Sequence, residues 1–463
     1  MLMKNSTRFR PYLPDQILLL PHDMRDWLDK DDLVYFIMDV LHDLDLTRIY
    51  GDYDGTKGGQ PPYDPQMMTG LLFYAYCTGT PSSRRIEKAT YHSVPFRVLT
   101  ADQHPDHDTI AEFRRRHLKA MSSLFVEVLR LCKKVGLVKL GHVALDGTKV
   151  RANASKHKAM SYGRMEKKAR ELEEEVARLL EEAETVDAEE DAKYGKGKRG
   201  DKLPEELRSR KGRLEKIRQA MKELEEEAKA KAEKKREEMR LKEVAAVESG
   251  KKRNGKKPKE PDDKPRDKAQ RNFTDPDSRI MKDGATGSFE QCYNAQIAVD
   301  DKKQIIVVSD VTQDANDKRQ VKPVVRKLEE NTSGEKPKII TADSGYLSEA
   351  NAKLLASFGI DAYIATGKEK HNRPLPLAPR GRIPKDATTV ERMQRKLRTV
   401  KGRSTYSKRK QIVEPVFGQI KEARGLRRFL VRGIENVRAE WELICLTHNL
   451  LKLYRSGRSV KTA

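Results

Sequence analysis

The chain has 463 residues, 94 of them Lys or Arg and 71 Asp or Glu, which gives a formal net charge of +23 at pH 7. This length is enough for two to four domains with a sizeable core. The excess of positive charge predicts a polyanionic partner, most simply nucleic acid, and no apolar run reaches the length needed to span a bilayer.

The N-terminal segment carries basic residues and a short apolar patch that Pro11 and Pro14 interrupt. No small-residue cleavage site follows the patch, so we expect no signal peptide. The four cysteines lie far apart and form no CxxC pair. They are typical of reduced core residues in a cytosolic protein, rather than of a zinc site or a disulfide framework.

Residues 1–137 predict an all-helical domain. Asp32 is placed to cap a first helix, a second fits Pro65 to Cys77, a third follows Ser82 or Ser83, and one or two more end at Gly136. Short helices with tight turns and the RRRH cluster at 114–117 suit a DNA-binding module. The alternative is a helical scaffold or dimerisation domain in which this cluster faces water.

The segment VKLGHVALDGTKV, residues 138–150, changes character. Its apolar core at 143–145 predicts a short strand that ends at Asp146. A carboxylate at the end of a buried strand is costly unless it binds a metal ion or hydrogen-bond donors. His142, just before the strand core, we interpret as structural.

Residues 160–270 form an inserted segment dominated by Glu, Lys and Arg. Apolar residues recur there at spacings of three and four in two stretches, which predicts an antiparallel helical hairpin of coiled-coil type that reverses around 193–204. The charged, Pro-containing run 251–268 is typical of a disordered linker. The hairpin could contact DNA or a second protomer, or act only as a spacer.

Residues 271–463 predict an α/β alternation. We expect, in order, strands at 292–300 and 304–311 joined by a turn, a helix at about 315–330, a strand at 339–342 that ends in Asp343, a helix at 347–359, a strand at 360–366, a Pro-containing loop and a last helix at about 435–455. The last helix is rich in Leu and is expected to pack on the sheet.

One carboxylate, Glu414, lies in a strongly basic helical stretch, residues 406–432. Glu414 and Lys421 are seven residues apart, two turns of helix, so they share a face. A carboxylate framed by cations fits a site that holds a metal ion beside phosphates. The alternative is a solvated amphipathic helix with one ion-paired acid.

Asp146, Asp343 and Glu414 together are a candidate metal site. Hydrolysis of a phosphodiester is served by two divalent ions roughly 3.5–4 Å apart, and carboxylates are their natural ligands. Acids that follow two strands and one from a late helix could converge on such a pair of ions. Each motif alone also occurs in ordinary turns.

Several segments together resemble the DDE transposases of bacterial insertion sequences, whose catalytic core has an RNase H-like fold. They are GQPPYDPQMMTGLLFYAYCTGTPSSRRIE near the N-terminus, ALDGTKVRANASKH, TDPDSRIMK, YNAQIAVD, TADSGY and YSKRKQIVEPVFGQIKEARGLRR. The resemblance implies an RNase H-like mixed sheet with flanking helices at 138–159 and 271–463, interrupted by the hairpin at 160–270 and preceded by the helical domain.

The same resemblance implies that Asp146, Asp343 and Glu414 are the catalytic triad and hold two Mg²⁺ ions, for which Mn²⁺ could substitute. The family commonly has three residues between its Arg and Glu, whereas four separate Arg409 from Glu414, so the choice between Arg409 and Lys410 as the assisting cation stays open. Contacts with DNA phosphates are assigned to Tyr406, Arg409, Lys410, Lys421, Arg424, Lys149 and Arg279.

The implied activity is cleavage at the ends of an insertion element and transfer of the freed 3′-OH into target DNA. The implied partners are both DNAs and a second copy of the chain or more, at the nucleoid in the bacterial cytoplasm, with no membrane partner. Two alternatives remain open. One is a metal-dependent nuclease of the same fold without strand transfer, and the other is an inactive, transposase-derived DNA-binding protein.

Overall fold

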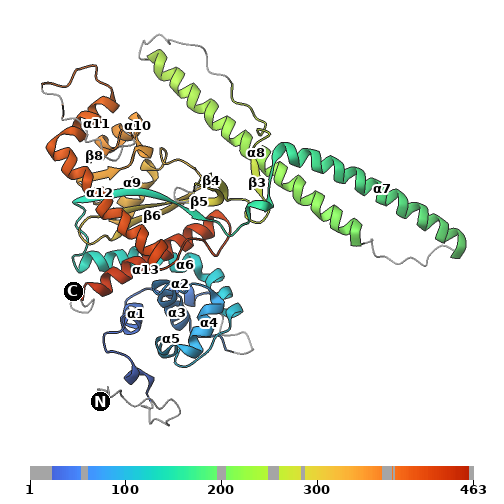
Figure 1. Cartoon of the computed structure of the whole chain (residues 1–463), viewed down its shortest axis with the longest axis horizontal. Helices are drawn as coiled ribbons and strands as arrows, with labels where there is room; N and C mark the ends of the chain where they lie inside the picture. The colour runs from blue at the N-terminus through green and yellow to red at the C-terminus, as the bar shows by residue number, and fades with distance from the viewer. Residues whose placement is uncertain are drawn as a thin grey trace, which may run out of the picture. The chain divides into compact units, whose positions relative to one another are not determined.

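The computed structural model describes residues 23–53, 61–194, 205–248, 260–282, 287–367, 378 and 381–457 (Figure 1). The predicted N-terminal patch, the reversal of the hairpin after 194 and most of the Pro-containing loop lie outside these residues. The chain divides into two compact units, Met1–His117 and Leu118–Ala463. No described helix is both long and apolar enough to cross a membrane.

The first unit is helical, as predicted. Its elements are η1 Met24–Trp27, α1 Leu33–His42, α2 Thr47–Tyr50, α3 Pro65–Cys77, α4 Ser83–His92, α5 Val94–Leu99 and the start of α6, His107–Lys134, which continues into the second unit. Asp32 accepts a hydrogen bond from Val34 N, the cap that the sequence predicts for α1. The short helices α2 and α5 were not predicted, and 107–134 is one helix.

Helix α3 is the centre of this unit and is buried on nearly all sides. A Cβ at Gly70 would lie 2.7 Å from Leu41 Cδ1, so the glycine allows α1 to pack closely against α3. The basic cluster of α6 is divided between inside and outside. Arg114 is buried and donates to Pro81 O and Ser83 Oγ, and His117 is buried, whereas Arg115 and Arg116 are exposed.

The second unit is built on a mixed sheet in the order β4-β5-β1-β7-β8, with β6 also paired to β5. The strands are β1 His142–Arg151, β4 Arg279–Lys282, β5 Phe289–Asp300, β6 Ile306–Thr312, β7 Ile339–Ala342 and β8 Asp361–Ile364. β5 runs antiparallel to β1, β4 and β6, while β7 and β8 run parallel to β1. This is the RNase H-like mixed sheet that the resemblance implies.

Strand β1 is longer than predicted. Pairing with β5 continues from Val143 through Arg151, so Asp146 lies inside the strand and not at its end. The expected end after 145 is wrong because the partner β5 is itself long, and its backbone pairs with the polar half of β1 as well as with the apolar half.

Helices flank the sheet: α9 Val321–Asn331, α10 Glu349–Ser357, α11 Thr389–Arg398, α12 Val400–Gly418, the π-helical turn Gln419–Ala423 and α13 Ile434–Arg455. The predicted packing of the last helix on the sheet is confirmed. Trp441 is fully buried and its Nε1 donates to Gln296 O of β5, and the Asn449 amide bonds both backbone groups of Ile306 in β6.

Helix α12 runs through Pro415 without ending there. Proline has no N–H, so the carbonyl of Gln411, one turn earlier, lacks its usual helical donor. The side chain of Gln304 replaces that donor, with Nε2 lying 2.8 Å from Gln411 O.

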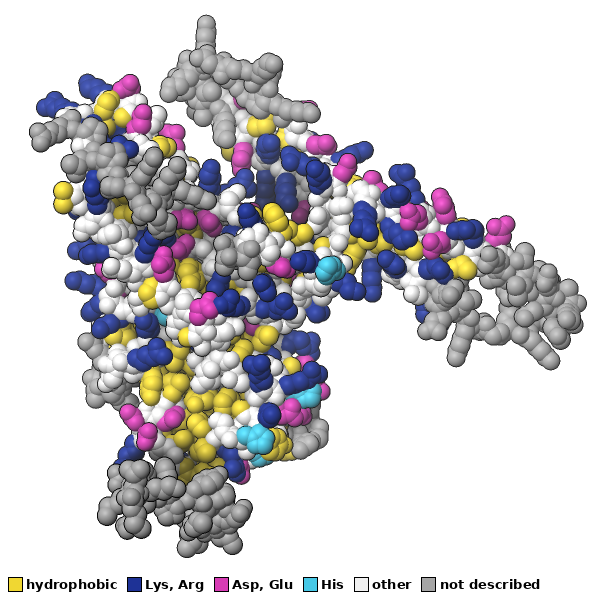
Figure 2. Space-filling view, viewed as in Figure 1, with side chains coloured by type: hydrophobic (Ala, Val, Ile, Leu, Met, Phe, Trp, Pro, Cys, Tyr) yellow, Lys and Arg dark blue, Asp and Glu magenta, His cyan; other side chains and the backbone are white. Residues whose placement is uncertain are grey.

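The two predicted hairpin helices are α7 Tyr162–Tyr194 and α8 Glu205–Glu248. Tyr162 Oη donates to Glu225 while Glu175 accepts from Arg210, so the helices are antiparallel. Six of the predicted apolar positions meet in one cluster, Met165, Ala169, Leu172, Leu214, Ile217 and Leu224, together with Ala220, which was not predicted. Figure 2 shows both signs of charge along these helices. Their coiled-coil character stays a prediction.

The segments that enter and leave the two helices lie next to each other. The short strands β2 Ala159–Ser161 and β3 Gln270–Asn272 pair, and Gly163 N lies 3.2 Å from Asp267 O. The described part of the predicted linker is placed against α8, because Arg236 pairs with Asp263 at 2.9 Å and donates to Pro261 O. The expectation of disorder is therefore wrong for residues 260–268.

Deleting the hairpin should leave the sheet folded, because Gly163 and Asp267 are close enough to be joined by a short Gly-Ser linker. Arg271 is buried and pairs with Glu223 and Glu227 of α8, so the deletion variant should also carry Arg271→Gln. We expect a cooperative thermal transition by circular dichroism. Loss of a cooperative transition would show that α7 and α8 are part of the core.

Acid should destabilise the second unit through His448. Burial, and next the positive charge of Arg424, lower the pKa of His448 to about 3, so the folded state holds a neutral ring whose Nε2 donates to Gln304 O. The unfolded ring titrates near pH 6.5, so the stability is complete above that pH and falls as the pH drops toward 3, by up to about 1.4 kcal/mol per pH unit. Urea unfolding from pH 7 to 4 should show this slope, and His448→Gln should reduce it. An unchanged slope in that variant would contradict the assignment.

Candidate active site

Two of the predicted acids lie side by side in the sheet. β1 and β7 are parallel neighbours, and Leu145 is in register with Ala342. The next residues, Asp146 and Asp343, therefore reach the same level of the sheet although nearly two hundred residues separate them. The predicted adjacency of the two strands is confirmed.

Asp146 is nearly enclosed and forms an ion pair with Arg409 of α12, with Arg409 Nη1 2.8 Å from Asp146 Oδ2. Its other oxygen accepts from Gly147 N at 2.9 Å. Burial raises the pKa of Asp146 to about 6, against the lowering effect of Arg409 and with a further raising effect of Asp343. Burial thus disfavours the charged form of the Asp146 carboxyl group, and the positive charge of Arg409 favours it.

Asp343 begins the short helical turn Ser344–Tyr346, and its side chain accepts from Gly345 N at 2.8 Å. Burial raises its pKa, and the negative charge of Asp317 adds to that effect. The charge of Asp343 in turn raises the pKa of Asp146. Two neighbouring carboxylates with raised pKa values form a site that would favour a divalent cation.

A third acid at this place, Asp317, was not predicted. Its Oδ1 accepts from Asn294 Nδ2 and from Gln296 Nε2, both at 2.7 Å. These two amides are fully buried on β5 and are two residues apart, so they share a face of the strand. Two polar residues at that spacing in an apolar strand could have marked Asn294 and Gln296 as site residues from the sequence. Asp317 lies in a polar loop segment, DANDK, where nothing in the sequence distinguishes it from its neighbours.

The charges of the three aspartates act on both Tyr346 and Lys149. Tyr346 is buried and donates to Gln296 Oε1. Burial, then the charges of Asp317, Asp146 and Asp343, raise its pKa. Burial lowers the pKa of Lys149, and the same three acids oppose that shift. Lys149 is therefore a positive charge among these carboxylates.

Glu414 is placed differently. It is exposed, and within the described residues it has no hydrogen bond or ion pair. A helix turns about 100° per residue, and the position four after Arg409 is Val413, which is fully buried. Glu414, one residue further on, therefore does not lie directly above Arg409 on the helix. Among the described residues, no three His, Cys, Asp or Glu side chains form a group that could hold a metal ion.

The predicted DNA-contacting residues occupy varied positions. Lys410 is exposed and Tyr406 partly so. Lys421 bonds Thr148 Oγ1 at 2.5 Å and Lys149 O at 2.8 Å. Arg424 is buried and donates to Thr447 Oγ1 and Ile444 O. Arg279 pairs with Glu227 of α8 at 2.9 Å. Arg424 therefore serves the packing of α13, and its burial makes the predicted contact with DNA wrong in this structure.

Comparison with family models gives two matches. The transposase DDE domain matches residues 256–450, and a transposase domain (DUF772) matches residues 22–116. The first interval contains Asp343 and Glu414 and begins after Asp146. The second contains α1 to α5 and the start of α6. No curated protein and no solved structure matches the chain.

Gly147 should tolerate no side chain. A Cβ there would lie 2.3 Å from Gln296 Nε2 and 2.9 Å from Asp317 Oδ1, and both atoms are held by their own hydrogen bond. We expect Gly147→Ala to lower the free energy of unfolding by about 1–3 kcal/mol, since overpacking a buried site costs that much. Gly141→Ala is the matched control, because a Cβ there meets nothing within 4 Å. Equal urea midpoints for the two variants would contradict the placement of Gln296 and Asp317.

Proposed function

The chain belongs to the transposases with a DDE domain, of the kind found in bacterial insertion sequences, and we propose that it cuts DNA at the ends of such an element and joins the freed 3′-OH to target DNA. The observation that carries this proposal is the parallel register of β1 and β7, which brings Asp146 beside Asp343. In this proposal the protein acts on DNA at the nucleoid, in the bacterial cytoplasm.

Transposases of this family depend on divalent metal ions. The oxygen donors present fit that requirement, because aspartate carboxylates are the ligands that Mg²⁺ and Mn²⁺ prefer. Asp146 and Asp343 would hold two such ions, with Glu414 as a further ligand. When bound, the ions would activate water and stabilise the leaving oxygen of the phosphodiester.

Arg409 is the cation that assists the acidic site in this proposal, rather than Lys410. Its ion pair with Asp146 fixes the orientation of that carboxylate and favours its charged form despite burial. Lys149, among the same acids, would offset the charge of an incoming phosphate. Lys410, exposed on α12, would contact the DNA backbone beside the site, with Tyr406 and Lys421.

The helical first unit would recognise the element ends. Arg115 and Arg116 are its exposed cations on α6, and both have carboxylate partners, Glu112 and Asp52, that DNA phosphates would replace. Bringing two element ends together requires at least two copies of the chain, so we propose a dimer or larger assembly on DNA.

Glu414→Gln should separate catalysis from binding. Removing the charge while keeping the shape should lower Mg²⁺-dependent end cleavage and strand transfer by roughly 10²- to 10³-fold, as when charge stabilisation in the transition state is lost. DNA affinity in a gel-shift titration should stay unchanged, because it rests on many Lys and Arg contacts. Glu422→Gln is the control, an exposed acid of the following turn that pairs with Arg427.

A Glu414→Gln variant that cuts DNA as fast as wild type would exclude Glu414 as a metal ligand. Cleavage by an Asp317→Asn variant, measured in parallel, then decides whether Asp317 is the third metal ligand in place of Glu414. Cleavage by wild type without strand transfer would identify a nuclease, and DNA binding without cleavage would identify an inactive, transposase-derived binding protein.

A further inference from the structure

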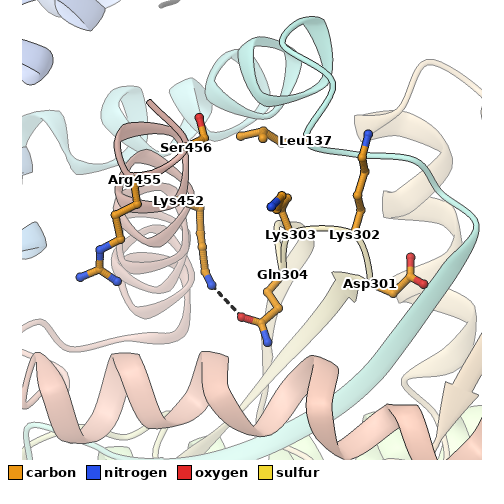
Figure 3. A pocket seen from close by; sticks show the side chains of 8 residues that line it. All are labelled: Leu137, Asp301, Lys302, Lys303, Gln304, Lys452, Arg455 and Ser456. Atoms are coloured by element: carbon orange, nitrogen blue, oxygen red, sulfur yellow. Dashed lines mark hydrogen bonds between the residues drawn. The ribbon is translucent and has the colours of Figure 1, made fainter. Parts of the chain in front are cut away.

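A cavity of about 470 Å³ lies where the turn between β5 and β6 meets the end of α13. Four cations, Lys302, Lys303, Lys452 and Arg455, contribute to its lining together with a single carboxylate, Asp301. Figure 3 shows Lys452 extending from α13 toward Gln304 of the turn, while Arg455 is on the other side of the helix. The lining therefore has a formal charge of +3, and it includes none of the acids of the candidate active site.

The turn that forms the floor of this cavity is fixed by buried groups. Asp300 is fully buried, and its two carboxylate oxygens accept from the backbone N–H groups of Leu140, at 2.7 Å, and Lys302, at 3.0 Å. Gln304 has a left-handed φ of 59°, and its carbonyl accepts from the neutral His448 ring at 3.0 Å. A floor held in this way would change little when a ligand binds.

The four cations have unequal surroundings: Lys302 Nζ donates to Gly136 O at 2.6 Å, whereas the charges of Lys303 and Arg455 both act on Lys452. In the described part of the chain, none of the four forms a salt bridge. Burial lowers the pKa of Lys452, and the positive charges of Arg455 and Lys303 lower it further. Lys452 Nζ donates to Gln304 Oε1 at 2.6 Å, which uses one of the three donors of an ammonium group. Two donors remain for an anion.

We propose that this cavity binds a backbone phosphate of DNA, at a point separate from the acids that would carry out the chemistry. The inference rests on the proposed function in taking DNA as the partner. Lysines act on phosphates as flexible point charges, and an anion beside Lys452 would offset the repulsion that Arg455 and Lys303 exert on it.

The position of the cavity fits a second contact on the same DNA. Asp301 N donates to His142 O at 3.0 Å, so the turn adjoins the start of β1. Asp146 is four residues further along, which is about 13 Å of strand at a rise of roughly 3.3 Å per residue. DNA carries one phosphate per about 3.4 Å of axis on each strand, so a segment of about four nucleotides covers that length.

The test is a salt titration of duplex DNA binding by fluorescence anisotropy, with the full chain. Lys303→Gln combined with Lys452→Gln keeps a hydrogen-bond donor at each place and removes both charges. We expect Kd to rise roughly tenfold at physiological salt, and the slope of log K against log salt to become shallower by about 1–2 units. The Arg pair, Lys303→Arg with Lys452→Arg, should restore the wild-type slope.

Lys322→Gln with Lys353→Gln is the matched control, since both lysines are exposed on α9 and α10 and the same charge is removed. It should leave the slope within about half a unit of wild type. Thermal unfolding of each variant shows whether the fold is kept. A pocket variant with the wild-type slope and Kd overturns the proposal.

Two further arms separate the possible outcomes. If the pocket variant loses affinity for inorganic phosphate or tripolyphosphate but binds DNA as wild type does, the cavity is a site for free anions and the DNA assignment is wrong. Cleavage measured at saturating DNA tests the proposed catalysis separately from the cavity. If the wild-type protein binds DNA through the cavity but does not cut it, the proposed catalysis is wrong and the phosphate site stands. No binding of DNA by wild type at any salt concentration would refute both.

Discussion

The partly buried ion pair between Asp146 and Arg409 is the contact on which the arrangement of the acidic site depends. It joins β1 to α12 across a sequence separation of 263 residues. Either charge alone would be costly in a site this enclosed, so the pair fixes which face of α12 meets the sheet. On the same helix, Lys410 and Glu414 are exposed.

Around that pair, small residues and amides determine how closely the acids approach. Gly147 and Gly345 both lie against Asp317, where a Cβ would come within 2.9 Å and 3.2 Å of its oxygens. The glycines that follow Asp146 and Asp343 in DG and DSG are thus packing requirements of the site as well as turn residues. The amides of Asn294 and Gln296 supply hydrogen bonds that make a third carboxylate tolerable there.

The sequence predicted most of the elements, because caps, periodicity and apolar runs are local signals. Helix α3 begins and ends at the predicted residues, and the pairing of β1 with β7 follows from two short apolar runs with acids after them. What the sequence could not supply came from distant partners. The length of β1 depends on β5, the burial of Arg424 depends on α13, and Asp317 joins the site only because β5 turns two amides toward it. The role of Glu414 and the domain boundaries stay predictions.

Gln304 occupies a backbone conformation that glycine or asparagine would adopt more easily. Its side chain has two duties, accepting from Lys452 and donating to the Gln411 carbonyl that Pro415 leaves without a helical donor. A glycine at position 304 would relax the turn, but Lys452 and the Gln411 carbonyl would lose their hydrogen bonds to the amide. Without Pro415, a helical N–H would bond the Gln411 carbonyl, and the bond from Gln304 would not be needed. Residues 304 and 415 should therefore vary together, if at all, since each is a reasonable choice only in the presence of the other.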